Sequence, residues 1–343
     1  MNKLSKDIKF LIAIIIAALI IAAIIVGVMM SSRSDVGKGN KESSNVSSET
    51  NSGDGSDLSA GEAVYDKNDG TIHDSLLVYE VIKDAKTPEM KVSSYYDINR
   101  EKMEIPSKVT YDGKEYTVTV IGKSAFESNT AMEEVIIPDT VKTIEANAFY
   151  SNAVLAKVTL SDSVSDIGNS AFAEDSELKE VKFGKGLKSL GDEVFSDCTG
   201  LESMSIPGTI ESMGKSVFYG CENMTKFEFG DGITVVGDEI FTNCYKLADV
   251  TIPESVVSIG KEAFWGCEKL KSVTLPSRIA VCGESAFYSC GIEELIIKSS
   301  ALQPSLEMLD GCDTLKKIKV PEALVNTYKS CYEDEDFTVE ADK

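Results

Sequence analysis

Eight cysteines are the residues of this chain best suited to metal or redox chemistry. Six of them continue one series at intervals of 22 or 23 residues: Cys198, Cys221, Cys244, Cys267, Cys290 and Cys312. Stacked at a strand spacing of about 4.8 Å, their Cα atoms would lie close enough for disulfides. Parallel side chains would oppose such bridges, so we expect buried structural thiols. No C-x-x-C pair occurs and histidine is scarce, so no metal site is predicted.

Catalytic chemistry is not indicated by the remaining residues. His73 is the only histidine and precedes the regular part of the chain, so we expect it on the surface and not beside a nucleophile. The carboxylates are many, but no pair stands out as the two acids of a glycosidase. There is no phosphate loop and no nucleotide fingerprint. We therefore predict no enzyme activity, no catalytic residue and no cofactor.

Aromatic residues offer ligand binding instead. Four of them directly follow a repeated phenylalanine: Tyr150, Tyr219, Trp265 and Tyr288. Exposed rings stack on sugars and act as hot spots in protein interfaces. Trp265 and Tyr288 would lie about 5 Å apart if their segments stack as neighbouring strands do. The alternative is that these rings pack over neighbouring turns and extend the edge of the core.

Polar residues in the expected strands form a second candidate surface. They alternate with apolar residues and would line up on one face of a sheet, as for Lys226, Glu228, Asp249 and Thr251. Curved repeat arrays often bind ligands on such a face. This face is chemically mixed and has no aromatic anchor, so a plain solvated sheet is the alternative.

A period of 23 residues determines the elements that position these side chains. Eight phenylalanines mark the period without a slip: Phe126, Phe149, Phe172, Phe195, Phe218, Phe241, Phe264 and Phe287. Two apolar columns alternate with polar positions, as in LKSVTLP at 270–276, which predicts a short strand with one buried face. The stretch around Ala-Phe, as in GKEAFWGC at 260–267, predicts one tight helical turn. We expect the glycine before it to hold a backbone angle that a Cβ would oppose.

Such short units cannot bury a hydrophobic face alone, so stacked neighbours must form the core. The sequence therefore predicts an α/β solenoid over 118–321, with one short strand and one helical turn in each repeat. A small β-rich N-terminal cap at 63–117 would cover the first repeat. Residues 322–343 would form the C-terminal cap.

The repeat unit resembles a known family. The segment VVSIGKEAFWGCEKLKSVTLP at 256–276 is similar to the BspA-like class of bacterial leucine-rich repeats, and the resemblance covers about 118–321. YDGKEYTVTVIGKSAF at 111–126 and KKIKVPEALVNTYKSCY at 316–332 resemble the two ends of such arrays. The resemblance implies a cell-surface or secreted protein, often an adhesin or a binder of host matrix proteins, with no shared active site. It also implies that the Asn or Cys three residues after each phenylalanine bonds backbone groups in the turn.

The N-terminal region predicts a membrane anchor. Residues 10–30 are uncharged and apolar, which is long enough for a transmembrane helix. Lys3, Lys6 and Lys9 precede them, so the positive-inside rule places residues 1–9 in the cytoplasm and the repeat domain outside the cell. A cleaved signal peptide is the alternative, although its apolar core would be shorter, about 7–15 residues. Residues 31–62 are rich in Ser and Gly and predict a disordered linker.

The formal charge of −22 limits the possible partners. Nucleic acids and anionic lipid surfaces require basic patches, so we expect no nucleic-acid partner. Solubility outside a cell, or cationic partners, fit this charge, and recruitment of calcium is left open.

The sequence thus predicts a single-pass bacterial membrane protein that displays a leucine-rich-repeat solenoid and binds an extracellular protein or glycan. Recognition or adhesion through the solenoid surface is the leading hypothesis. A carbohydrate-binding surface protein and a passive structural envelope protein are the alternatives.

Overall fold

The computed structural model describes residues 62–67, 70–96 and 100–342. The chain divides into one unit at residues 1–56 and a second at 57–343, and the described residues belong to the second. The predicted cytoplasmic segment at 1–9 and transmembrane helix at 10–30 lie outside the described residues, and so does nearly all of the predicted linker. Within the described ranges, no helix is long and apolar enough to cross a membrane.

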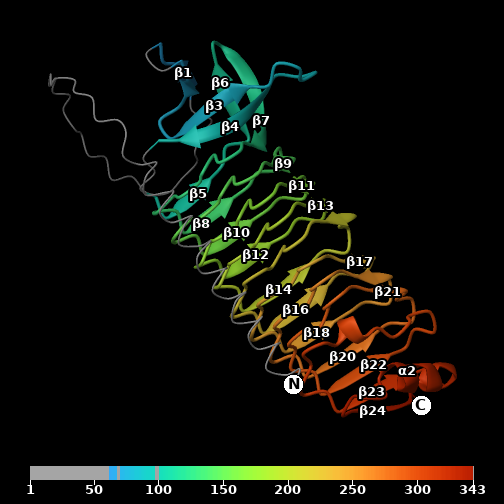
Figure 1. The fold of residues 1–343 in the computed structure, drawn as a ribbon. Helices are drawn as coiled ribbons and strands as arrows, with labels where there is room; N and C mark the ends of the chain where they lie inside the picture. The colour runs from blue at the N-terminus through green and yellow to red at the C-terminus, as the bar shows by residue number, and fades with distance from the viewer. Residues whose placement is uncertain (1–61, 68–69, 97–99, 343) are drawn as a thin grey trace, which may run out of the picture. The chain divides into compact units, whose positions relative to one another are not determined.

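The first part of the described chain is a small β structure that leads into the repeats (Figure 1). Its strands are β1 (Glu62–Tyr65), β2 (Ile72–His73), β3 (Leu77–Val81), β4 (Glu89–Tyr95), β5 (Lys102–Glu104), β6 (Lys108–Tyr111) and β7 (Lys114–Ile121). Antiparallel pairs join β1 to β2, β2 to β3, β3 to β4, and β6 to β7. Parallel pairs join β1 to β6 and β4 to β7. Strands β7 and β5 then pair in parallel with the first shorter and the first longer strand of the repeats.

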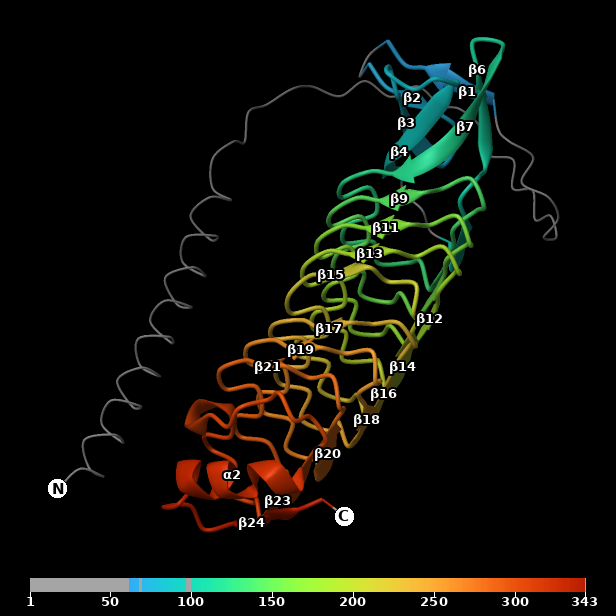
Figure 2. The same ribbon diagram turned by 90° about the vertical axis from the view of Figure 1, so that its right-hand side faces the viewer.

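Each regular repeat contributes one longer and one shorter strand, and these form two rows of parallel strands (Figure 2). The longer strands are β8 (Glu134–Ile136), β10 (Lys157–Thr159), β12 (Glu180–Lys182), β14 (Ser203–Ile206), β16 (Lys226–Phe229), β18 (Asp249–Thr251), β20 (Ser272–Leu275), β22 (Glu294–Ile297) and β23 (Lys317–Val320). The shorter strands are β9 (Thr143–Ile144), β11 (Asp166–Ile167), β13 (Ser189–Leu190), β15 (Ser212–Met213), β17 (Val235–Val236), β19 (Ser258–Ile259) and β21 (Val281–Cys282). The register is one period, as where Val158 pairs with Val181. The predicted stack of repeats is confirmed, and the second strand of each repeat was not predicted.

The last coil is less regular than the others. It contains the 3₁₀ turn η1 (Leu306–Met308) before β23. After β23 come η2 (Glu322–Leu324), the helix α2 (Val325–Cys331) and β24 (Thr338–Ala341). Strand β24 pairs in parallel with β23, so it adds one more strand to the row of longer strands.

The helical turn that we predicted around Ala-Phe is not confirmed, since this segment consists of two successive tight turns. Ala125 N–H donates to Gly122 O at 3.1 Å, and Glu127 N–H donates to Ser124 O at 3.2 Å. Ser124 and Ser128 have φ values of 55° and 58°, in the left-handed region that a right-handed helix excludes. This geometry leaves Phe126 N–H free to donate to Ala148 O of the next coil at 2.7 Å. The turns therefore pair between coils as the strands do.

Glycine recurs before each turn for a different physical reason from the one that we predicted. Gly260 is not among the residues with positive φ, whereas Glu262, two positions later, has φ 55°. A Cβ at Gly260 would stand 2.5 Å from Asp238 N of the preceding coil. The prediction of an unusual backbone angle at this glycine was wrong: the close approach of the neighbouring backbone excludes a side chain there.

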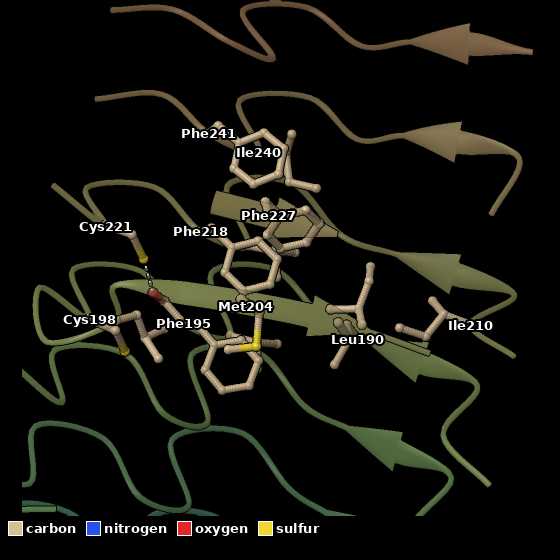
Figure 3. Packing of buried hydrophobic residues seen from close by; sticks show 14 of the residues in the cluster. Leu190, Phe195, Cys198, Met204, Ile210, Phe218, Cys221, Phe227, Ile240 and Phe241 are labelled. Atoms are coloured by element: carbon tan, nitrogen blue, oxygen red, sulfur yellow. Dashed lines mark hydrogen bonds between the residues drawn. The ribbon is translucent and has the colours of Figure 1, made fainter. Parts of the chain in front are cut away.

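The phenylalanines form a continuous stack through the core. Neighbouring rings lie 5.1–5.9 Å apart between centroids and are stacked, and all eight are fully buried. Figure 3 shows Phe195, Phe218 and Phe241 in this arrangement. Tyr95 of β4 stacks on Phe126 at 5.7 Å, so the N-terminal β structure covers the first ring.

Replacing Phe218 with alanine removes a ring that stacks on both of its neighbours. We expect the free energy of unfolding to fall by about 3–5 kcal/mol, as for other buried Phe→Ala changes. Urea unfolding of the full chain in a neutral detergent measures the loss. Tyr65→Ala is the matched control, because Tyr65 is 51% exposed. Equal effects of the two changes would contradict the stacked core.

The side chains three residues after each repeated phenylalanine bond backbone groups, as the family resemblance implied. Asn129 Oδ1 accepts the N–H groups of Ala131 and Met132 at 2.9 and 2.8 Å. In the cysteine repeats the thiol donates to a carbonyl of the preceding coil, as from Cys221 Sγ to Phe195 O at 3.2 Å (Figure 3). All eight cysteines are free thiols. Burial raises the pKa of the Cys221 thiol well above its ordinary value, so this sulfur stays a neutral donor.

Asp175 places a carboxyl group in the same buried column. Its Oδ1 accepts the N–H of Asn152 at 2.7 Å, whereas its Oδ2 has no hydrogen-bond partner among the described residues. Burial raises the pKa of Asp175 to about 9, and the hydrogen bond from Asn152 opposes this shift only in part. The carboxyl group is therefore protonated in the folded protein at neutral pH.

Asp175→Asn should stabilise the protein at pH 8. The carboxyl group has its ordinary pKa of 3.8 in the unfolded chain and a pKa of about 9 in the folded one, so the wild-type chain loses stability as the pH rises between these values. The asparagine variant lacks this loss. We expect it to be more stable by several kcal/mol at pH 8, at about 1.4 kcal/mol for each pH unit above 3.8, and nearly unchanged at pH 3.5, by urea unfolding. The same difference at both pH values would contradict a buried neutral carboxyl.

Candidate binding site

The aromatic pair predicted from the sequence is present in the structure. The rings of Trp265 and Tyr288 lie 4.4 Å apart between centroids, with 38° between their planes. Both side chains are half-buried at the turns that follow Phe264 and Phe287. They form one small aromatic surface, and their buried part also contributes to the edge of the core.

The other two predicted aromatics do not join this pair. Tyr219 Oη accepts a hydrogen bond from Asn243 Nδ2 at 3.1 Å. Tyr150 lies several coils away and donates its hydroxyl to Glu174. This hydrogen bond, with a smaller contribution from burial, raises the pKa of Tyr150 to about 12. Both hydroxyl groups are thus engaged by neighbouring coils.

Tyr245 is an aromatic residue that was not predicted from the sequence. It is 37% exposed, and a Cβ on Gly266 would stand 3.7 Å from its ring. Tyr245 follows the repeated phenylalanine by four positions and not by one, so it fell outside the column that we considered. It adds a ring beside the coil that carries Trp265.

The predicted residues of the sheet face lie together, but their charges are paired. Lys226 Nζ lies 2.8 Å from Glu228 Oε1 and 3.9 Å from Asp249 Oδ2. The hydrogen bond to Glu228 and the charge of Asp249 raise the pKa of Lys226. Thr251 stands opposite Glu228 in the strand register. This patch is exposed, and its single lysine is shared between the two carboxylates.

The same pairing recurs along the row of longer strands. Lys157 pairs with Glu134 at 3.2 Å on neighbouring strands, and Lys182 pairs with Glu180 at 3.3 Å on one strand. Near the end of the array, Lys319 Nζ lies 2.9 Å from Glu294 Oε1. Exposed ion pairs contribute little stability. Their effect here is to leave the sheet face with few unpaired charges for a partner.

A hollow in the last coil was missed from the sequence. This cavity, the C-terminal pocket, has a volume of about 500 Å³. It is lined by Leu306, Glu307, Leu309, Asp310, Gly311, Cys312, Asp313, Leu315, Tyr332, Asp334, Glu335, Asp336 and Phe337. Cys312 continues a repeated column, but the carboxylates of this segment lie outside the columns, so none of them was a candidate. The one available signal was the local excess of Asp and Glu.

A second hollow, of about 450 Å³, lies beside the shorter strands. It occurs where β15 and β17 are not hydrogen-bonded to each other, which divides this row of strands into two sheets. Val235 and Val281 are 49% and 56% exposed at its edge. Lysine and aspartate side chains share its lining, so it has no clear chemical preference.

The repeats of this chain match a known family of leucine-rich repeats. The sequence model of the BspA type leucine rich repeat region matches residues 119–248 and 234–339, with six copies. The chain belongs to the BspA-type leucine-rich-repeat family. The matched region runs through the described coils and includes the C-terminal pocket. Membership supports protein–protein recognition in general, and the match indicates no catalytic family.

Solved structures show the same fold. A leucine-rich repeat protein from Bacteroides ovatus is 24% identical, with a TM-score of 0.61 over 78% of this chain and 76% of its own. A leucine rich cell surface protein from Faecalibacterium prausnitzii is also 24% identical, with a TM-score of 0.50 over 74% of this chain and 71% of its own. The search of curated proteins found no match.

The aromatic pair can be tested as a surface separate from the core of this BspA-type array. Because Trp265 and Tyr288 are only partly buried, we expect each change to alanine to lower the free energy of unfolding by about 1–2 kcal/mol, less than the about 3–5 kcal/mol for a fully buried ring. Urea unfolding of the full chain measures this. Phe264→Ala, one position before Trp265, is the matched core variant. A loss at Trp265 as large as that at Phe264 would assign the tryptophan to the core.

Proposed function

We propose that this chain is a membrane-anchored bacterial surface protein whose repeat domain recognises another protein outside the cell, as an adhesin or a receptor does. The observation that carries the proposal is the BspA-type array itself, matched over residues 119–339. Arrays of stacked repeats present long, rigid surfaces for partners. The structural relative from Faecalibacterium prausnitzii is described as a cell surface protein, which is in keeping with this location.

The location rests on the N-terminal sequence. Residues 10–30 are apolar and follow three lysines, so the repeat domain would stand outside the cell on the linker at 31–62. The negative charge of the chain suits an exported protein that avoids nucleic acid and anionic lipid.

Carbohydrate binding is the second candidate function. It is favoured by the ring pair of Trp265 and Tyr288, whose centroids lie 4.4 Å apart and whose faces are partly open. The pair is small, and the sheet face formed by the longer strands carries paired charges instead of further aromatic rings. A glycan would therefore have one stacking platform and few other contacts.

Mass spectrometry of the protein extracted from membranes tests the anchor. An uncleaved anchor predicts that peptides from residues 1–30 are recovered with the membrane fraction. A mature N-terminus near Ser31 would show that the segment is a cleaved signal and that the protein is secreted.

Binding of the full chain, purified in a neutral detergent, to an array of matrix proteins and glycans tests recognition. We expect saturable binding to a protein, which survives Trp265→Ala with Tyr288→Ala. Saturable binding to a glycan that this double change abolishes would establish the carbohydrate function in its place. A folded sample that binds nothing on the array would contradict both and favour a structural role in the envelope.

A further inference from the structure

The C-terminal pocket carries negative charge that the protein does not neutralise. Six carboxylates stand around it: Glu307, Asp310, Asp313, Asp334, Glu335 and Asp336. None of the six makes an ion pair within the described part of the chain, and no lysine or arginine lines the pocket. On the sheet face, in contrast, lysines and carboxylates pair throughout. The unpaired charge is therefore a local property of the pocket.

The floor of the pocket is apolar. Leu309, Leu315 and Tyr332 are at most 7% exposed, and the ring of Phe337 lies 5.3 Å from that of Tyr332. Leu306 stands at the rim and is 56% exposed. The pocket thus combines an apolar base with a carboxylate rim.

The hollow arises because the regular stack ends here. Phe287 N–H donates to Met308 O at 3.2 Å, as each earlier phenylalanine donates to the residue before the next ring. The following residue is Leu309, so a smaller side chain occupies the column of rings. The coil is then covered by α2 and the loop after it, and not by another repeat.

Two tyrosines of α2 and its C-terminal end fix the walls of the pocket. Tyr328 donates its hydroxyl to Leu302 O at 3.0 Å, and Tyr332 donates to Ser305 O at 2.8 Å. Both bonds tie the C-terminal cap to the irregular segment before η1. A pocket held in this way is formed before a ligand arrives, which lowers the entropy lost on binding.

Gly311 connects the pocket to the aromatic pair. Gly311 lines the pocket and has φ +73°, and a Cβ there would stand 3.2 Å from the ring of Tyr288. Tyr288 in turn contacts Trp265. A segment that leaves the pocket along Gly311 would therefore meet these two rings.

We propose that the C-terminal pocket binds a polypeptide segment of a partner protein that carries lysine or arginine next to aliphatic residues. The carboxylates meet the cation, the apolar floor takes the aliphatic side chain or the stem of the lysine, and the aromatic pair offers a further face for a cation. This inference rests on the proposed recognition function and names the chemistry of the partner.

Other occupants fit these contacts less well. Phosphates, nucleic acids and acidic glycans would meet six carboxylates of their own sign. A bare metal ion needs converging ligands, and no cluster of three suitable side chains occurs among the described residues. A basic segment uses both the rim and the floor.

The only tryptophan of the sequence, Trp265, contacts Tyr288, whose ring lies next to Gly311 of the pocket, so its fluorescence provides a readout. Its fluorescence is titrated in the full chain in neutral detergent with three capped tetrapeptides: Leu-Lys-Leu-Lys, Ser-Lys-Ser-Lys and Leu-Glu-Leu-Glu. We expect saturable binding of the first peptide, at least fivefold weaker binding of the second, and none of the third. Affinity for the first should fall as salt rises.

Two charge variants separate the pocket from the overall charge of the protein. Asp334→Asn with Asp336→Asn should weaken binding of the Leu-Lys peptide about 5- to 10-fold, as expected for the loss of two exposed ion pairs. Glu228→Gln with Asp249→Asn changes the net charge equally on the sheet face and should leave the affinity unchanged. Thermal melting confirms that both variants are folded.

Three outcomes would overturn the assignment. They are equal affinity for the Leu-Lys and Ser-Lys peptides, equal weakening in the two variants, and no binding of the Leu-Lys peptide. Each would rule out the pocket as a site for basic segments that also carry aliphatic residues, while leaving the recognition function to the protein array. Conversely, peptide binding at the pocket without any partner on that array would support the site and count against adhesion to those matrix proteins.

Discussion

The whole structure depends on the in-register approach of successive coils at the spacing of β strands. Each coil places the same backbone groups 23 residues further along the chain, so hydrogen bonds link neighbours at the longer strands, the shorter strands and the turns. This approach explains the glycine at positions such as 260, where a neighbouring backbone leaves no space for a Cβ. It also explains why asparagine and cysteine serve equally in the buried column, because both donate to or accept from the backbone of a nearby turn.

The same constraint directs where binding can occur. In the regular coils, side chains of like position are held beside one another, and on the sheet face lysines and carboxylates pair at this spacing. A surface whose lysines and carboxylates are paired offers a partner few unpaired charges. The stack of rings ends at the C-terminal end of the array, where Leu309 takes the next place after Phe287 and the C-terminal cap covers the coil. There the carboxylates lack ion-pair partners and surround an apolar floor, so the chemistry of this end differs from that of the array.

Periodicity made the regular part of the fold predictable, and its absence hid the rest. Alternation in segments such as 270–276 predicted the longer strands, and the register of the columns predicted that Trp265 and Tyr288 would touch. The shorter strands have only two residues, too few to show alternation, so they were missed. The turn was taken for helical because the sequence does not reveal the positive φ of Glu262, a residue type that seldom adopts it. The C-terminal pocket depends on residues 306–337, which come together only through the packing of the cap.

Amide hydrogen exchange of the full chain, resolved by residue, tests the stacking of coils most directly. Each of the eight phenylalanine N–H groups donates to a carbonyl of the next coil, as from Phe195 to Val217 O at 2.9 Å. Because each coil is stabilised by its neighbours, we predict strong protection of these amides from Phe172 to Phe241, declining toward both ends of the array. Rapid exchange of the central phenylalanine amides, at the rate of exposed turn residues, would contradict the stacking of coils.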